Sequence, residues 1–361
     1  MENQKLEALR AETIRQLRDI QKKKIDPAED AKNLMRRLIG RKLPPRDLLF
    51  WPTGMLMLGL AAGNITSAEK EALAAAVRNW EKAGKKLYYP DDTLSGAALL
   101  TAALLNTSGS FGIKEEFMPV LKQMKQFLDE TPRDPSGMII YRPGRGNEEI
   151  LADGIGMSAM FYALYGRVCG DTASAAEAAR QLRLYLDKAS EPGAGFPFHG
   201  LAGEEKKGLC GWGRAVGWLL LGMAETAAAL PDGEENIAER TRQLFDRILP
   251  YQRKNGLLPW KMTDDLTEPT DLSASAMTGY ALLRMRQQGL WLRDREKQYG
   301  VFTRKLKDGI LKQTDENGRA DGALAECLGF GQHPQHYGVY PWGQGSALAF
   351  LKLAEQENNL L

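Results

Sequence analysis

Aspartate, tryptophan and arginine residues recur at the start of long apolar segments, where their side chains could act together. Asp91 and Asp153 each open such a segment, and a carboxyl group can donate a proton and later take one back. Tryptophan rings offer flat apolar platforms on which sugars stack, and an arginine can hold a carboxylate through two hydrogen bonds. These residue types together predict a site for an anionic sugar. The residues at the segment starts are Trp51, Asp91, Asp92, Asp153, Trp212, Arg214, Asp271, Trp342 and Gln344.

Six segments share one design, a polar or aromatic start followed by small residues and then an apolar helix. Helical periodicity dominates the chain, with Leu, Ala and Met recurring at positions i, i+3 and i+4. Because these helices are apolar nearly all round, we expect them to be buried. The segments are WPTGMLMLGLAAG from Trp51, DDTLSGAALLTAALL from Asp91, DGIGMSAMFYALYG from Asp153, WGRAVGWLLLGMAETAAAL from Trp212, TDLSASAMTGYALLRM from Thr270 and PWGQGSALAFLKLAE from Pro341.

More charged, amphipathic segments alternate with the apolar ones and are typical of outer helices with a solvated face. SAEKEALAAAVRNWEKAG and TASAAEAARQLRLYLDKA are two examples. Six buried helices alternating with such segments predict an all-α fold, an (α/α)6 barrel. If the inner helices run parallel, their N-termini meet at one mouth, where free N–H groups favour an anionic ligand. Strand signals are scarce, and SGMIIYRPG is the best short candidate.

We expect one catalytic domain over residues 1–361, with residues 1–45 as an N-terminal helical segment. No Pro-, Gly- or Ser-rich linker divides the chain, although a two-domain helical protein is the structural alternative. The N-terminus is charged and amphipathic without the apolar region of a secretory signal. No stretch reaches the ~18 apolar residues that a membrane span needs. These features predict a cytoplasmic protein.

The composition argues against several classes of partner. Of the 361 residues, 43% are hydrophobic and 26% charged, which is compatible with a large buried core. The net charge is only +2, and no dense basic stripe indicates a nucleic-acid binder. Cys169, Cys210 and Cys327 are far apart, so neither a disulfide framework nor zinc-ligand spacing is indicated. We therefore expect no metal, no cofactor, no nucleic-acid partner and no membrane partner.

A set of motifs resembles those of the unsaturated uronyl hydrolases, glycoside hydrolase families 88 and 105, and family 105 more closely. WGRAVGWLLLGMAETAAALP resembles the W-x-R-x-x-G-W helix of these enzymes, and LADGIGM resembles the L-D-G-x-x-M motif that carries the catalytic aspartate. PDDTLSG, ILPYQRKNGLLPW, TDLSASAMTGYAL and PWGQGSALAFLKLAE resemble further motifs in the same order. The order and spacing, from about Trp51 to Glu355, make the set specific.

The resemblance implies a role for each matched residue. Asp153 would be the general acid and base, and Asp91 the second aspartate of the catalytic centre. Trp212, Arg214 and Trp218 would contact the substrate. The rhamnogalacturonyl enzymes have a histidine eleven residues before the catalytic aspartate, where this chain has Arg142. With these, the expected substrate contacts also include Tyr141, Arg142, Trp51, Asp271, Trp342 and His336, the histidine nearest to PWGQG.

The implied reaction is hydration of the C4=C5 double bond that polysaccharide lyases leave on a terminal uronic acid. This bond is a vinyl ether, so a proton added at C4 creates an oxocarbenium-like cation. Water then adds at C5, and the hemiketal opens to release the aglycone. A free aspartate titrates near pH ~3.9, so Asp153 needs a raised pKa, which a neighbouring Asp91 would provide. The expected substrate is an unsaturated uronyl di- or oligosaccharide, preferably of the rhamnogalacturonan type.

Two other functions remain open, a sugar epimerase or isomerase of the same fold and a non-catalytic glycan-binding barrel. Epimerases usually recruit histidines, and His199, His333 and His336 all lie outside the inner-helix starts. The simpler interpretation gives those histidines a loop or surface position. Asp153 could likewise only cap its helix, and a buried tryptophan could only pack the core.

Overall fold

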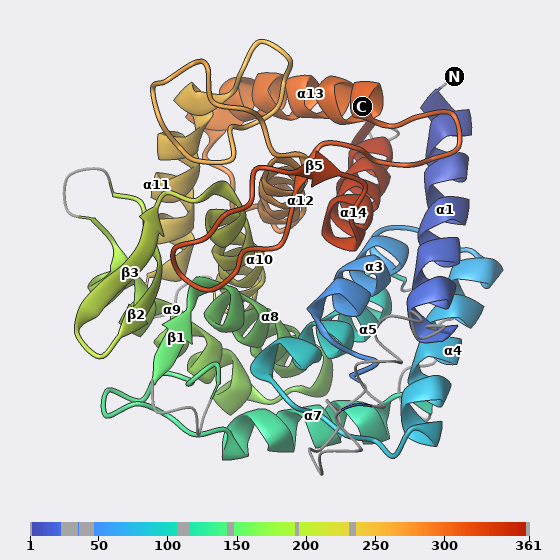
Figure 1. The fold of residues 1–361 in the computed structure, drawn as a ribbon, viewed down its shortest axis with the longest axis vertical. Coiled ribbons are helices and arrows are strands. Elements are labelled where there is room, and N and C mark those ends of the chain that lie inside the picture. The colour runs from blue at the N-terminus through green and yellow to red at the C-terminus, as the bar shows by residue number, and fades with distance from the viewer. Residues whose placement is uncertain are drawn as a thin grey trace.

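A closed ring of apolar helices forms the centre of the protein in this computed structural model, which describes residues 2–22, 35, 47–106, 116–142, 148–191, 195–230 and 236–358. Each inner helix packs on the next, and the last packs back on the first (Figure 1). The inner helices are α3 (Trp51–Ala61), α5 (Thr93–Leu105), α8 (Ala152–Cys169), α10 (Gly213–Ala229), α12 (Leu272–Gln287) and α14 (Pro341–Asn358).

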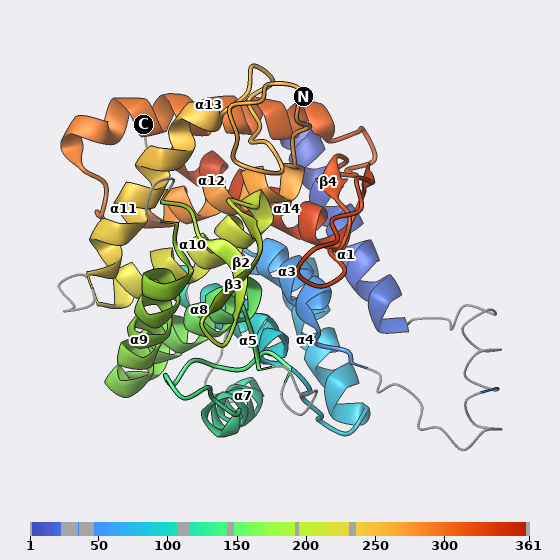
Figure 2. The same cartoon turned by 60° about the vertical axis from the view of Figure 1, so that its left-hand side comes forward.

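Amphipathic helices surround this ring as an outer layer. They are α1 (Glu2–Lys22), α4 (Ser67–Lys82), α7 (Met118–Glu130), α9 (Thr172–Ala189), α11 (Ile237–Ile248) and α13 (Glu296–Gln313). Helix α1 packs against α14, α3 and α4, so it fills the outer position between the last and first inner helices (Figures 1 and 2). The predicted (α/α)6 barrel is confirmed. The single domain over residues 1–361 stays a prediction, and most of its 1–45 segment beyond Lys22 lies outside the described residues.

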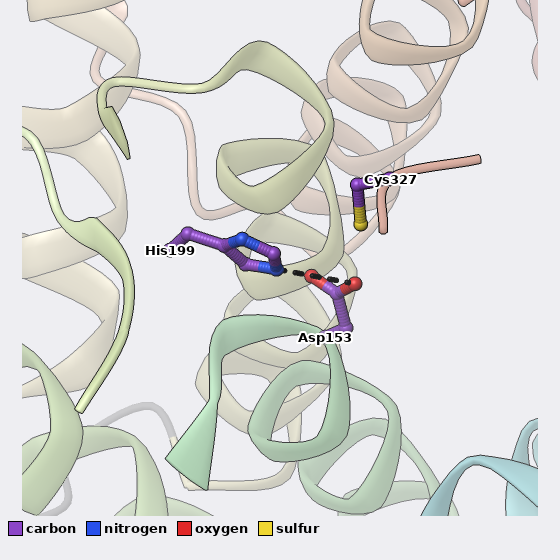
Figure 3. Close-up of side chains that lie close together, drawn as sticks. All are labelled: Asp153, His199 and Cys327. Carbon is purple, nitrogen blue, oxygen red and sulfur yellow. Dashed lines mark ion pairs between the residues drawn. The ribbon is translucent and has the colours of Figure 1, made fainter. Parts of the chain in front are cut away.

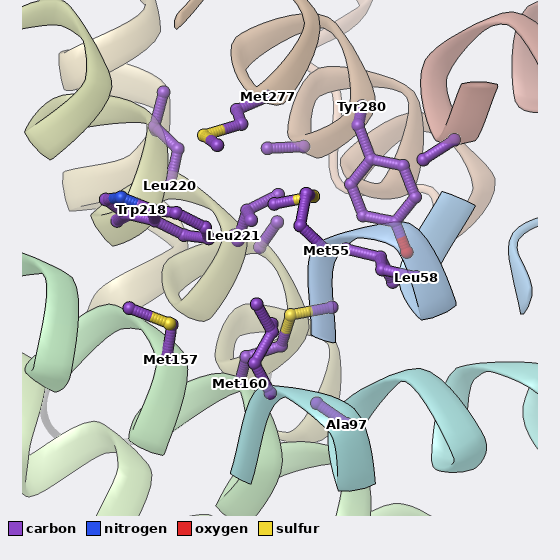
Figure 4. Packing of buried hydrophobic residues seen from close by; sticks show 14 of the residues in the cluster. Met55, Leu58, Ala97, Met157, Met160, Trp218, Leu220, Leu221, Met277 and Tyr280 are labelled. Carbon is purple, nitrogen blue, oxygen red and sulfur yellow. The ribbon is translucent and has the colours of Figure 1, made fainter. Parts of the chain in front are cut away.

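The barrel interior is filled by side chains that are nearly inaccessible to solvent. Met55 of α3, Met160 of α8, and Met277 and Tyr280 of α12 gather in the middle of the ring (Figure 4). Methionine suits this position because its flexible side chain fills irregular gaps. Small residues bring α8 and α10 together, since a Cβ on Gly156 would lie 2.3 Å from the carbonyl oxygen of Trp218.

Short strands lie at the mouth of the barrel. β1 (Glu149–Leu151), β2 (Phe198–Ala202) and β3 (Glu205–Cys210) form an antiparallel sheet beside α8 and α9, and β4 (Ala323–Leu324) pairs with β5 (Tyr337–Gly338). Within the expected strand SGMIIYRPG, the described residues form only an isolated bridge from Ile139 to Arg133. Short 3-10 helices complete the elements: η1 (Pro90–Asp92), η2 (Leu249–Tyr251) and η3 (Arg293–Arg295).

The residues between β4 and β5 run across the near face of the ring (Figure 1). We call residues 323–338 the covering segment. It is largely irregular, with β4 and β5 at its two ends. In the part of the chain that the structure describes, no helix has the length and apolar character to cross a membrane.

A buried ion cluster links α8, α10 and α12. The carboxylate of Glu225, fully buried on α10, accepts from the Nε of Arg284 at 2.6 Å and pairs with Arg167 Nη1 at 3.3 Å. Arg284 is itself 1% exposed. Because both arginines would lose their counter-charge together, this carboxylate is a strong determinant of stability.

Replacing Glu225 by Gln is expected to lower the free energy of unfolding by about 3 kcal/mol, because it leaves a buried guanidinium unpaired. Chemical denaturation of the two proteins measures the difference. Glu239→Gln is the matched control, since Glu239 is 39% exposed and pairs with Arg242 on the surface of α11. Its loss is expected to stay below about 1 kcal/mol. Equal losses in the two variants would contradict the interpretation.

Candidate active site

Aromatic rings from the starts of the inner helices meet at one end of the barrel. The ring of Trp51, at the start of α3, lies 4.8 Å from that of Trp342 on α14 and 6.0 Å from that of Trp218 on α10. A cavity opens at this end. Six of the predicted site residues line it: Trp51, Tyr141, Arg142, Asp153, Arg214 and Trp218. The expected meeting of helix starts around one cavity therefore describes this end well.

Asp153 projects into this cavity from the first turn of α8. Its side chain is 15% exposed, and its Oδ1 atom is buried without a hydrogen-bond partner among the described residues. The residue at the N-cap position of α8 is Leu151, and no side chain caps this helix. The capping interpretation of Asp153 is therefore wrong, and its carboxyl group is left available for a ligand.

His199 is the residue that pairs with Asp153 in the cavity, although the two side chains are too far apart for a hydrogen bond. It lies on β2 with 1% of its side chain exposed, and its Nε2 is 3.8 Å from Asp153 Oδ2 (Figure 3). Neither ring nitrogen has a hydrogen-bond partner among the described residues. The expected loop or surface position of His199 is wrong, because the sheet folds this side chain inward against Trp212, at 4.5 Å between ring centroids.

Asp91 reaches the cavity only through a second residue. It is fully buried on η1, and its Oδ2 accepts a hydrogen bond of 2.5 Å from the hydroxyl of Tyr141, which lines the cavity. Burial raises the pKa of Asp91 to about 7, and the charges of Asp47 and Asp153 act in the same direction. The Tyr141 hydrogen bond and the charge of Arg142 oppose this rise.

The raised pKa of Asp91 predicts a pH dependence of stability. Between its ordinary value of 3.8 and about 7 the folded protein holds a proton that the unfolded chain has lost. Stability should therefore fall as pH rises through that window. Asp91→Asn should make the fall shallower in thermal unfolding measured across these pH values. An unchanged slope would contradict the assignment. Asp47, whose pKa is also raised by burial, should preserve part of the slope.

Asp92 does not line the cavity, and its side chain instead stabilises the backbone turn before η1. Its Oδ2 accepts from the backbone N–H of Tyr88 at 2.6 Å and of Tyr89 at 3.3 Å. Burial, together with the charges of Asp91 and Asp47, raises its pKa well above the ordinary value. The two neighbouring aspartates thus have different partners, since Asp91 bonds the Tyr141 hydroxyl and Asp92 the backbone just before η1.

Two arginines give the cavity positive charge. Arg214 is 2% exposed and stacks over Trp212 and Trp342, with 4.8 and 5.3 Å from its Cζ to the ring centroids. It forms no ion pair with any described carboxylate, so its charge is available to an anion. Arg142 is half-buried and lies 5.5 Å from the ring of Tyr141. The cavity is therefore suited to a ligand with a carboxylate.

The backbone of Leu324 and Ala325 is held by residues that were expected to bind substrate. Arg214 donates to the carbonyl oxygens of both, at 2.6 and 2.9 Å. The indole N–H of Trp342 donates to the Leu324 oxygen at 2.8 Å, and Asp271 accepts from the Leu324 N–H at 3.1 Å. These contacts fix the start of the covering segment above the cavity.

Besides Asp91, four of the predicted site residues do not line the cavity: Trp212, Asp271, Trp342 and His336. Trp212 is fully buried behind His199, and Asp271 caps α12 by accepting from Ser273 N at 2.9 Å. His336 is exposed and contributes its backbone oxygen to Ala325 N. In its place, His333 packs within the aromatic cluster, 4.8 Å from Trp212.

The covering segment adds residues that no motif indicated. Cys327, Phe330 and the exposed Glu326 line the cavity beside Asp153. Burial raises the pKa of the Cys327 thiol to about 12, and the charge of Asp153 adds to this. The covering segment carries no recognisable motif. Only its position directly before the last inner helix could have indicated that it lies near the cavity.

Comparison with known proteins gives one family. The model of Glycosyl Hydrolase Family 88 matches residues 39–356. "Protein Atu3128" of Agrobacterium fabrum is 35% identical over 119 residues, 30% of this chain and 50% of that protein. The chain thus spans about half the length of the curated relatives it matches.

Solved structures with the same fold cover nearly the whole chain. A possible member of the GH105 family from Salmonella enterica serovar Paratyphi A has a TM-score of 0.74 at 19% identity, covering 99% of this chain and 94% of that one. An unsaturated glucuronyl hydrolase specific for heparin has a TM-score of 0.70 at 15% identity, covering 99% of each chain. At these identities the likeness establishes the fold.

Proposed function

Because the chain belongs to glycosyl hydrolase family 88, we propose that it releases the 4,5-unsaturated uronic acid from the non-reducing end of lyase-generated oligosaccharides. Family membership makes it a glycoside hydrolase with an oligosaccharide substrate. The observation that carries the finer proposal is the position of Asp153, an available carboxyl group in a cavity that also contains two arginines and two tryptophans.

Asp153 is the group that exchanges protons with the substrate. As an acid it protonates C4 of the vinyl ether, and the positive charge then develops at C5 and the ring oxygen. As a carboxylate it next takes a proton from the water that adds at C5, so one residue serves both steps. The hemiketal formed in this way opens without further help from the protein and releases the aglycone.

His199 and the Tyr141–Asp91 pair support this carboxyl group. The 3.8 Å from His199 Nε2 to Asp153 Oδ2 needs a shift of only about 1 Å to become a hydrogen bond. Tyr141, fixed by Asp91, borders the cavity on the side of Arg142. We assign His199 and Asp91 to positioning, because a group that gives a proton to carbon must hold one orientation.

The arginines provide recognition of the uronate carboxylate. Arg214 is the stronger candidate, because it is buried, stacked on two indole rings and unpaired with any described carboxylate. Arg142 is a second cation at the same cavity. Trp51 and Trp218 supply apolar platforms for the sugar. We propose a rhamnogalacturonan-type disaccharide as the preferred substrate and cytoplasmic turnover of such products.

The test is loss of the ultraviolet absorbance of the C4=C5 bond when purified protein meets unsaturated disaccharides. A panel covers galacturonyl-rhamnose, glucuronyl-rhamnose and glycosaminoglycan types. In deuterated water the product should carry one deuterium at C4, as hydration requires. Absorbance that persists with every disaccharide would refute the proposal, and product without deuterium would refute the hydration route.

An epimerase or isomerase is the second candidate, and one observation favours it. His199 lies beside Asp153, whereas the sequence placed no histidine at the start of an inner helix. An imidazole and a carboxyl group on one cavity are an acid and base pair of the kind such enzymes use. Conversion of a saturated sugar to its epimer, with the unsaturated panel untouched, would support that function over the hydrolase. Sugar binding without any turnover would instead support a glycan-binding barrel.

A further inference from the structure

Three side chains with different ligand chemistry converge at the cavity. A carboxylate oxygen of Asp153, an imidazole nitrogen of His199 and the Sγ of Cys327 all lie within 4.8 Å of one another. They come from α8, from β2 and from the covering segment, and Figure 3 shows them pointing toward a common centre. Oxygen, nitrogen and sulfur donors together form the set that borderline-soft divalent cations prefer.

The second observation is that polar atoms of Asp153 and His199 lack a hydrogen-bond partner among the described residues. His199 is 1% exposed, yet neither of its ring nitrogens makes a hydrogen bond within the described chain. Asp153 Oδ1 is buried in the same condition. A buried polar atom without a partner destabilises the folded protein. Coordination of a cation would satisfy both residues at once.

We propose that Asp153, His199 and Cys327 form a binding site for Zn²⁺ with a fourth position open to the cavity. Bonds of about 2.0 Å to nitrogen and oxygen and about 2.3 Å to sulfur place tetrahedral ligand atoms roughly 3.3–3.6 Å apart. The Asp153–His199 separation of 3.8 Å is close to this value. To bind the same ion, Cys327 must move closer to the other two ligands. It lies in irregular backbone, which can make this adjustment.

The charges near the site also fit a divalent cation. Asp153 and the Cys327 thiolate together supply two negative charges, which balance Zn²⁺ while His199 binds as a neutral ligand. The thiol proton leaves on binding, so affinity should increase with pH. Arg214 opposes the cation, because its charge acts on Cys327. The burial that lowers the pKa of His333 to about 4 keeps that neighbour uncharged.

The site gives the enzyme a metal-controlled off state. When Asp153 binds Zn²⁺, it is a carboxylate whose oxygen lone pairs are donated to the metal. It therefore has no proton to give and cannot accept one. This consequence rests on the proposed function, whereas metal binding does not. Substrate and cation would exclude each other, because the fourth ligand position faces the space that the sugar occupies.

Cobalt provides the test, because Co²⁺ is a spectroscopic substitute for zinc. Tag-free, chelator-treated protein titrated with Co²⁺ should develop thiolate-to-cobalt absorption in the near ultraviolet and tetrahedral bands in the visible. One equivalent of Zn²⁺ should abolish both. Calorimetry with Zn²⁺ should give one site per chain. Cys327→Ala and His199→Gln should each weaken zinc binding by 10²-fold or more, about 2.7 kcal/mol.

The control is Cys210→Ala, a half-buried thiol whose Sγ donates to the backbone oxygen of Phe196. It should bind Co²⁺ like the parent protein. Absence of thiolate-to-cobalt absorption, or the same absorption in Cys327→Ala, overturns the inference. Should Cys327→Ala fail to fold, as judged by thermal unfolding, His199→Gln decides the matter. Zinc binding by a protein whose metal-free form has no turnover supports the metal site and counts against the proposed function, and turnover by a protein that binds no zinc does the reverse.

Discussion

Replacing Asp153 by Asn is expected to lower kcat on an unsaturated uronyl disaccharide by at least about 10³-fold, because an amide can neither protonate C4 nor deprotonate water. The substitution preserves the shape of the side chain, and Asp153 makes no capping contact. The KM should therefore change little, and the melting temperature should stay near that of the parent protein. Absorbance kinetics and thermal unfolding measure the two quantities separately.

Glu326→Gln is the matched control for Asp153→Asn. Glu326 is an exposed carboxylate that lines the same cavity, so its removal tests the general effect of losing negative charge there. We expect its kcat to stay within a few-fold of the parent value. A similar loss in both variants would mean that field effects, and not proton transfer by Asp153, account for the rate. Retained activity in Asp153→Asn would exclude it as the acid.

Arg214→Met is expected to have the second largest effect, a loss of about 10²- to 10³-fold in kcat/KM. Removing one member of a buried charge pair costs about 2–5 kcal/mol, and the substrate carboxylate is the expected partner of this arginine. The loss should disappear for a substrate whose carboxylate is methyl-esterified. Parent enzyme and Arg214→Met should therefore act on the ester at nearly equal rates.

Arg214 also donates to Leu324 and Ala325, so its substrate contact must be separated from its hold on the covering segment. Trp342→Phe removes the indole donor to the Leu324 oxygen but keeps an aromatic ring beside Arg214 and the guanidinium itself. A loosened covering segment would lower activity on acid and ester alike in this variant. Discrimination between acid and ester that survives in Arg214→Met would contradict the assigned carboxylate contact.

The barrel could be predicted because its signal is repeated and local. Each inner helix has the same polar or aromatic start and the same apolar body, so six weak patterns support one another. The position of α1 could not be predicted in the same way. Its amphipathic face indicates a surface helix, but only the closed ring reveals that this face covers α14 and α3.

Of the predicted residues that line the cavity, four belong to inner helices and two, Tyr141 and Arg142, precede α8. Asp153, Arg214 and Trp218 line the cavity as expected, because each lies in the early turns of its helix. His199 and Cys327 were missed because a strand pairing and an irregular segment bring them there. Neither the strand pairing nor the irregular segment produces a periodic pattern in the sequence, so the positions of His199 and Cys327 could not be predicted from it.

Adjacent residues also have functions that their order along the chain does not distinguish. Asp91 and Asp92 are indistinguishable in the sequence, yet Asp91 accepts a hydrogen bond from the Tyr141 hydroxyl and Asp92 accepts one from the backbone N–H of Tyr88. The difference arises from the tight η1 turn, which points the two side chains apart. Asp271 opens a helix as Asp153 does, but it caps α12 and holds Leu324.

Closure of the ring by its last helix has a consequence for the order of events during synthesis. Glu69 on α4 is paired with Arg10 of α1 and with Lys352 of α14, which is 283 residues farther along the chain. At roughly 5–20 residues per second, a ribosome needs about 15–60 s to travel between them. Among the described residues, only Arg10 can pair with Glu69 during that interval, and the face of α3 that packs on α14 stays uncovered. The nascent chain therefore acquires its mouth, including Trp342, only as the final helix leaves the ribosome.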